Sequence, residues 1–429
     1  MTATEREAVD EEQAATVSGT GSEVLAGSLG EYTRSWFKRA RHGESGMLPV
    51  IIGLIAIVVI FQTQSGFFLS AGNLTNLFAQ DAAAYVLLGM AEVFVLLLGE
   101  IDLSAGFVGA IGGFFTVWLS TSEGWPWGPA IIAGLAIPAA IGAAMGLIIV
   151  RLRVPSFVVT LAGLLGFQGV LLFLIDHLGG KSTGGTIRDP AYVNGLVNSS
   201  MPIVIAWIVL AVALTVFAVL LVYRDWARRR SGLAAPPLGL TVAKVVAVAV
   251  AGVVLVLICS ANRGVGFTVL NGVPWDIPIV LGIVVLWSVL LSRTRFGRYV
   301  YAIGGNAEAA RRAGINLARI RVASFALCSL TAAAGGIIYA ARLGSITSNI
   351  DGGQLVLYAV AAAVIGGTSL FGGRGKIIHA LLGGVVIATI DNGMGLLSLS
   401  ADVQFMVTAL VLLAAVTVDA LARRGQTAT

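Results

Sequence analysis

Charged residues are scarce in this sequence of 429 residues. Asp, Glu, Lys and Arg make up 11% of it, whereas hydrophobic residues make up 57%. Soluble domains carry about 25% charged residues. The composition therefore excludes an ordinary soluble protein. The net charge of +5 does not indicate a nucleic-acid-binding protein either, because the basic residues are spread along the chain between apolar runs.

Cysteine and histidine are also rare. The two cysteines, Cys259 and Cys328, both lie inside apolar runs, and the three histidines, His42, His177 and His379, are far apart in the sequence. These spacings exclude a disulfide framework and give no cluster of metal ligands. We predict no metal site.

Motifs for catalysis and nucleotide binding are missing as well. The segment GGKS, from Gly179 to Ser182, resembles the end of a phosphate-binding loop, but Ile175 stands where such a loop needs a glycine. The sequence shows no Ser/His/Asp set and no paired carboxylates in a polar segment. We therefore predict that the chain is not an enzyme and binds no cofactor. A process that needs ATP would depend on a partner protein.

Long apolar runs fill the chain from Met47 to Leu421 instead. A membrane-spanning helix needs about 20 such residues. Backbone polar groups cannot stay unpaired in lipid, so only helices or a closed barrel can span it, and the absence of period-2 alternation favours helices. We predict an all-α polytopic membrane protein with about 12 spans, or 10–12 if some helices are broken. The runs begin near Met47, Ala83, Ala105, Trp127, Phe157, Met201, Val242, Asp276, Ala323, Gln354, Ile377 and Val403.

The basic residues orient these spans. With the amino terminus inside and twelve spans, 23 of the 27 Lys and Arg residues fall on the cytoplasmic side. Cytoplasmic loops carry such an excess. We therefore predict that both termini are cytoplasmic. The four exceptions are Lys181, Arg188, Arg263 and Arg342.

Three regions follow from this topology. Residues 1–45 form an acidic segment rich in Ser, Thr, Ala and Gly, which we predict to be a disordered cytoplasmic tail with a basic juxtamembrane end. Residues 46–422 form the transmembrane domain, and residues 423–429 form a short cytoplasmic tail. Within the domain, GxxxG at Gly142 and Gly146 permits close helix packing.

A short charged segment, GGNAEAARRAGI from Gly304 to Ile315, lies in a predicted cytoplasmic loop. Asn306 is a suitable N-cap, Gly314 a suitable C′ residue, and Glu308 and Arg312 are spaced i, i+4. A helix of about seven residues, about 10 Å long, is not stable alone in water. Either the membrane domain or a docked partner must hold it. The alternative is a solvated loop whose charges set the topology.

The pattern EAAxxxG in this segment resembles the coupling motif of ABC importer permeases. The longer stretch TRFGRYVYAIGGNAEAARRAGI is similar to the form found in ribose/xylose-class sugar permeases. Three further stretches stand in that family's order: GEIDLSAG (residues 99–106), VPSFVVTLAGLLGFQG (154–169) and AVIGGTSLFGGRG (363–375). Glu100 before IDLS looks most like the xylose type. Ribose-type relatives are shorter, and we assign the extra length to the segment Arg224–Gly239 and the span after it.

The resemblance implies a permease subunit in the bacterial plasma (inner) membrane that imports a monosaccharide, with a xylose- or ribose-like pentose favoured. Its implied partners are a second copy of the permease, two ABC ATPase subunits that bind ATP and Mg, and an extracytoplasmic sugar-binding protein; nucleic acid is not among them. The implied ATPase-coupling set is Glu308, Ala309, Ala310, Arg311, Arg312 and Gly314.

Other polar residues have two interpretations each. Glu100, Asp102 and Ser104 belong either to a gate or to the cap of the following helix. Glu92 falls in the middle of a predicted span, where a carboxylate is either a functional residue or a protonated group bonded to a neighbouring helix. The candidate residues of the substrate path, or else of helix packing, are Phe157, Thr160, Gln168 and Asn392.

Two other functions stay open at this point. One is a proton-coupled secondary transporter with Glu92 as the relay, which would be expected to show internal repeats. The other is an ABC permease for nucleosides or branched-chain amino acids. The sequence alone does not separate the cargoes.

Overall fold

The computed structural model describes residues 47–179, 187–188, 195, 198–232, 236–264, 269–347, 350 and 352–427. The predicted amino-terminal tail and residues 428–429 of the predicted carboxy-terminal tail lie outside these ranges. The chain divides into two compact units, and the described residues of the first lie within Val204–Leu257, without 233–235. The second unit comprises Gly46–Ile203 and Ile258–Thr429.

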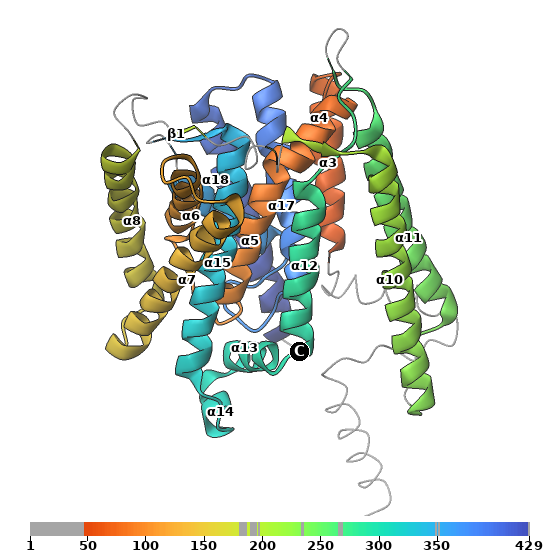
Figure 1. Cartoon of the computed structure of the whole chain (residues 1–429). Helices are drawn as coiled ribbons and strands as arrows, with labels where there is room; N and C mark the ends of the chain where they lie inside the picture. Colours follow the sequence, from red (N-terminus) through yellow and green to blue (C-terminus); the bar gives the residue numbers. More distant parts are fainter. Residues whose placement is uncertain are drawn as a thin grey trace, which may run out of the picture. The chain divides into compact units, whose positions relative to one another are not determined.

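Helices make up most of the described chain (Figure 1). In chain order they are α3 (Leu48–Gln64), α4 (Ala71–Asn76), the π-helix η1 (Leu77–Ala82), α5 (Ala83–Leu96), α6 (Ala105–Thr121), α7 (Trp127–Leu152), α8 (Ser156–Leu178), α10 (Ile203–Arg230), α11 (Leu238–Ser260), α12 (Asp276–Arg293), α13 (Arg295–Gly305), α14 (Ala307–Arg312), α15 (Leu317–Leu343), α16 (Gly352–Ile365), α17 (Ile377–Leu396) and α18 (Ala401–Thr427).

The strands are short connectors between these helices. Strand β1 (Ile187–Arg188) pairs antiparallel with β4 (Ser345–Ile346). Strand β2 (Ser200–Met201) pairs antiparallel with β3 (Val273–Pro274). Each pair joins segments that are far apart in the sequence.

Eight helices in the described part of the chain are long and apolar enough to cross a membrane, and four apolar helices are shorter. The prediction of an all-α polytopic membrane protein is therefore confirmed. One predicted start was wrong: the span expected from Ala83 begins at Ala71, because α4, η1 and α5 form one continuous helix through Leu96. The polar residues of AGNLTNLFAQD lower the hydropathy of its first turns.

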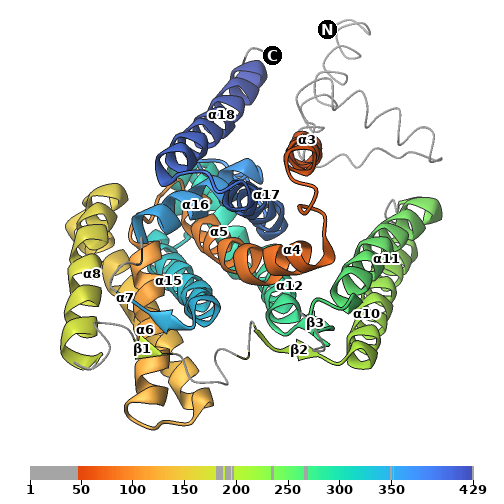
Figure 2. The ribbon, with the colours of Figure 1, turned by 90° about the horizontal axis from the view of Figure 1, so that it is seen from above.

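Helix α5 forms the centre of the second unit. All of its 14 residues are buried, and it packs against α15, α16 and α17. Figure 2 shows it surrounded by these helices when the ribbon is seen from above. A helix that is apolar around its whole circumference belongs in such a position.

Glycines let α7 approach α15 closely. A Cβ atom at Gly142 would overlap the carbonyl oxygen of Phe325, and one at Gly146 would lie 2.9 Å from the Cα atom of Val322. The GxxxG pair therefore acts in helix packing, as predicted. The contact requires glycine because a methyl group would push the two backbones apart.

The first unit is a helical hairpin of α10 and α11. Asp225 near the end of α10 is buried, and its carboxylate accepts hydrogen bonds from Arg224 and, at 2.5 Å, from the hydroxyl of Thr241 in α11. From the sequence we predicted that this region accounts for the extra length of the chain relative to shorter permeases of the resembling family. Residues 224–230 of that segment form the last two turns of α10.

We expect Gly142→Ala to destabilise the protein by about 1–3 kcal/mol, because the added methyl overpacks the contact between α7 and α15. The matched control is Gly166→Ala in α8, where a Cβ meets nothing within 4 Å. Thermal unfolding of the purified protein in detergent measures both variants. Equal unfolding temperatures for the two would contradict the packing described here.

Candidate functional site

Two short helices, α13 and α14, connect α12 to α15 at one end of the second unit (Figure 1). The sequence predicted only the second of them. Helix α13 begins after Thr294, whose side chain accepts a hydrogen bond from the backbone N–H of Gly297. The hydroxyl of Tyr301 donates to the carbonyl oxygen of Gly375 at 2.8 Å, which holds α13 against the loop before α17.

The four motif stretches are linked by contacts at this end of the unit. Gly304 lies so close to the carbonyl oxygen of Leu97 that a Cβ would overlap it. The same oxygen accepts a hydrogen bond from the N–H of Gly373 at 2.9 Å. The hydroxyl of Thr160 donates to the carbonyl oxygen of Ile101 at 3.2 Å. Leu97 and Gly373 are 276 residues apart in the sequence, so distant segments meet beside α13, while Thr160 joins the 154–169 stretch to Ile101.

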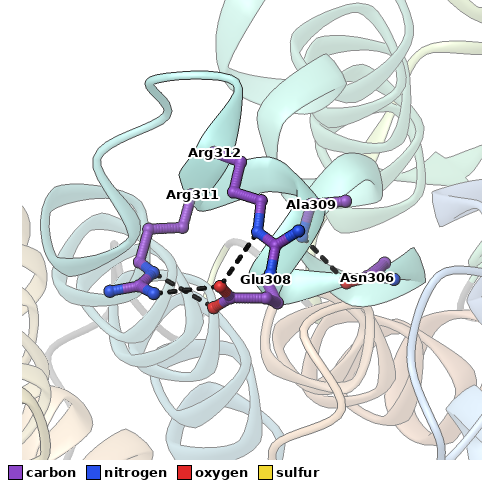
Figure 3. A network of polar contacts seen from close by, with 5 residues as sticks. All are labelled: Asn306, Glu308, Ala309, Arg311 and Arg312. Carbon is purple, nitrogen blue, oxygen red and sulfur yellow. Dashed lines mark hydrogen bonds and ion pairs between the residues drawn. The ribbon is translucent and has the colours of Figure 1, made fainter.

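Helix α14 is capped at both ends. The side chain of Asn306 accepts a hydrogen bond from the N–H of Ala309 at 2.9 Å (Figure 3). Gly314 follows the helix with a φ of 80°, a left-handed conformation that favours glycine. Both predicted end residues are confirmed. Ala310 is buried, so the segment is a helix packed on its own domain and not a solvated loop.

The charges of α14 face away from the domain. The carboxylate of Glu308 pairs with Arg311 at 2.9 Å and with Arg312 at 3.2 Å (Figure 3). The Arg312 pair was predicted from spacing, and the Arg311 pair was not. Hydrogen bonds from Arg311 and then Arg312 lower the pKa of Glu308, so it is ionised at neutral pH. Ala309 and Gly314 are exposed beside them, so this set is accessible from solvent.

Glu100 lies at the base of the same surface. Its carboxylate pairs with the guanidinium of Arg321, in the second turn of α15, at 2.6 Å. The Glu100 side chain is only 9% exposed, whereas that of Arg321 is 35% exposed. This ion pair joins the loop after α5 to the helix that directly follows α14.

Asp102 and Ser104 form a turn and not the expected helix cap. The carboxylate of Asp102 accepts hydrogen bonds from the N–H of Ser104 at 2.9 Å and from its hydroxyl at 2.6 Å. Ser104 occupies the N-cap position of α6, but its side chain makes no capping bond. The capping prediction is therefore wrong in its details, because the Ser104 hydroxyl is already bonded to Asp102. The thiol of Cys328 also points at Asp102, at 3.7 Å.

The remaining predicted residues lie in different places. Glu92 is fully buried in α5. Thr160 is buried near Ile101, while Phe157 and Gln168 lie on the exposed face of α8. Asn392 lies in α17, where its amide bonds to Asn73 and Asp81. The structure therefore does not bring the four proposed path residues together.

We expect Arg321→Ala to lower the free energy of unfolding by about 1–3 kcal/mol, because it leaves the buried carboxylate of Glu100 without a hydrogen-bonding partner. The double variant Glu100→Gln/Arg321→Ala should recover part of that loss. Arg319→Ala, at an exposed position of the same helix, is the matched control. Thermal unfolding of the purified proteins in detergent measures these differences. If Arg321→Ala is as stable as Arg319→Ala, the ion pair does not stabilise the protein.

Comparison with known proteins places these features in a family. Residues 73–416 match the family described as "branched-chain amino acid transport system / permease component". The chain is 36% identical over 383 residues to the xylose transport system permease protein XylH of Escherichia coli K12, covering 87% of this chain and 92% of the relative. It is 30% identical to the ribose import permease protein RbsC of the same organism, over 90% of this chain and 95% of the relative. The D-allose transport system permease protein AlsC, also from that strain, is 28% identical over 86% of this chain and 90% of its own length. No solved structure matches.

Proposed function

Because this chain belongs to the branched-chain amino acid transport system permease component family, we propose that it is the membrane-spanning subunit of an ABC importer for a monosaccharide. The resemblance to ribose/xylose-class permeases, inferred from four short motifs, is confirmed by the relatives. Its place is the bacterial inner membrane, as a multi-pass protein. A xylose- or ribose-like pentose is the favoured cargo, since the xylose and ribose permeases share more identity with the chain than the allose permease does.

The observation that carries the proposal is the surface around α14. The motif stretches are linked by contacts at this end of the unit, and the capped helix presents Glu308, Arg311 and Arg312 to solvent. We assign this surface to the contact with an ABC ATPase, which binds ATP and Mg. Movement of the ATPase would reach the membrane domain through α14 and then through α15. Such coupling needs contacts that differ between two states, and a capped, anchored helix supplies defined ones.

The full importer in this proposal contains two copies of the permease, two ATPase subunits and an extracytoplasmic sugar-binding protein. The positive-inside distribution supports a topology with α14 and both termini in the cytoplasm. The twelve apolar helices are compatible with as many as twelve spans, although four of them are short.

The relatives favour this function over the alternatives. The printed names of the xylose, ribose and allose permeases support a sugar and not an amino acid or a nucleoside as the cargo, even though the family description mentions branched-chain amino acids. A proton-coupled transporter with Glu92 as its relay would act without an ATPase. That alternative has no support from these relatives.

Purification of the tagged chain from its native membranes in mild detergent tests the proposed assembly. We expect a P-loop ATPase to copurify, together with a secreted sugar-binding protein when sugar is present. Reconstituted vesicles should then take up sugar only with ATP. A chain that purifies alone and moves sugar under a proton gradient would contradict the proposal.

Replacement of Gly314 tests the role of α14. Gly314→Pro should abolish ATP-driven uptake without preventing membrane insertion, because proline cannot adopt a φ of 80° and lacks the N–H that bonds to Arg311. Gly314→Ala should reduce uptake less severely, since a left-handed conformation costs alanine about 1–2 kcal/mol.

The matched control for the alanine variant is Gly305→Ala, at an exposed position where a Cβ meets nothing within 4 Å. That variant should transport normally. Uptake that stays unchanged in Gly314→Pro would refute the assignment of α14 to coupling.

A further inference from the structure

A charged cavity lies at the other end of α15, far from α14. Its volume is about 320 Å³, which falls within the range of about 300–1,000 Å³ for small-molecule sites. Four separate elements supply its lining: η1, α15, α17 and α18. The lining residues are Asp81, Arg342, Asp391, Asn392, Gly395, Leu396 and Gln404.

The ion pair of Asp81 and Arg342 fixes one wall. Their side chains approach to 2.6 Å, and the Asp81 side chain is only 6% exposed. The second oxygen of Asp81 accepts a hydrogen bond from the amide of Asn392 at 3.2 Å. The carbonyl oxygen of that amide accepts one from Asn73 at 2.9 Å. Asp81 belongs to the π-helix η1, a rare conformation that occurs frequently at functional sites.

Two tyrosines hold Asp391, another residue of the lining. The hydroxyl of Tyr85 donates to Asp391 at 2.8 Å, and the hydroxyl of Tyr358 donates to its other oxygen at 3.3 Å. Tyr358 in turn accepts a hydrogen bond from Gln354 at 2.9 Å. The polar side chains of the cavity are therefore held on helices by partners behind them, which favours precise contacts with a ligand.

The lining chemistry suits a neutral, polyhydroxylated ligand. Two carboxylates face one guanidinium among the lining residues, so the cavity carries one excess negative charge and disfavours anions. Carboxylate and amide oxygens accept hydrogen bonds from hydroxyls, and the amides of Asn392 and Gln404 can also donate. Only Leu396 contributes a large apolar side chain.

The position of the cavity agrees with the direction of import. Arg342 lies 25 residues after the first residue of α15, which corresponds to about 38 Å along the helix. Helix α14 precedes that first residue, and Figure 1 shows it at the opposite end from β1, the partner of β4 that follows α15. If α14 faces the ATPase, the cavity faces the side from which sugar arrives.

We propose that this cavity is an outer contact site for the transported monosaccharide, with Asp391, Asn392 and Gln404 touching its hydroxyls, while Asp81 holds Asn392 in place and two tyrosines hold Asp391. This inference rests on the proposed function. Binding here must be weak, since a conducted solute has to leave each site it occupies. The two described cysteines are buried, which makes a thiol placed in the cavity a selective probe.

The test places a cysteine in the cavity of the full importer, in vesicles with its ATPase and binding protein. Asn392→Cys should react with a membrane-impermeant thiol reagent added from outside, and excess xylose should slow that reaction severalfold. Asp402→Cys is the matched control, because Asp402 is exposed in α18 and does not line the cavity. It should react whether or not sugar is present. Absence of labelling at Asn392→Cys, or labelling that xylose does not slow, would overturn the inference.

Uptake selectivity gives a second, independent measurement. Asp391→Asn and Gln404→Ala should each change the ratio of xylose to ribose uptake by about threefold to tenfold, the effect of one or two hydrogen bonds. Asp402→Asn should leave the ratio unchanged. A defect in folding would lower both rates equally and leave the ratio intact, so an unchanged ratio in both cavity variants also counts against the site.

Two further outcomes would replace the proposed sugar site with another function. Protection of the cysteine by sodium or potassium chloride but not by xylose would replace the sugar site with a cation site. A wild-type importer that takes up no monosaccharide with ATP would overturn the proposed function itself, and cysteine protection by another neutral solute would then identify the ligand class of the cavity.

Discussion

The second unit depends on two ion pairs, one at each end of the antiparallel helices α5 and α15. Asp81, just before α5, pairs with Arg342 near the end of α15, and Glu100, just after α5, pairs with Arg321 near its start. The two carboxylates are 19 residues apart, or about 28 Å along a helix, which is close to the hydrocarbon thickness of about 30 Å. Each charge can therefore stay near a membrane boundary while the buried helix between them crosses the apolar region.

Helix α15 is packed so closely against α6 and α7 that a shift of α15 would move these helices with it. Glycine and alanine line its contacts with α6 and α7, where a Cβ at Gly109 or Gly142 would meet a backbone oxygen at short distance. Packed helices with so little free space move as units more readily than they deform. The loop that carries α14 continues directly into α15, so the solvent-exposed charges and the outer cavity lie on the two ends of one packed element.

Much of this arrangement could be predicted from local sequence. Apolar runs located the helices, and Asn306 and Gly314 marked the ends of α14 because capping depends on residues within one turn. Helix α13 escaped prediction because RFGRYVYAIGG is anchored by distant partners such as Gly375. The cavity escaped for the same reason: Asp81 and Arg342 are far apart in the sequence, and only folding brings them together. The sequence held one signal of this cavity: Arg342 is a basic residue on the predicted outer side, where the positive-inside rule expects few.

The hairpin of α10 and α11 has an evolutionary consequence. Its buried Asp225 is bonded by Arg224 and Thr241, both within the hairpin, and strands β2 and β3 bring together the chain segments before and after it. An element with its own polar partners and adjacent ends can be inserted into an ancestral gene, or deleted from it, as a single block. Loss or gain of this helix pair would therefore leave the ion pairs between α5 and α15 intact.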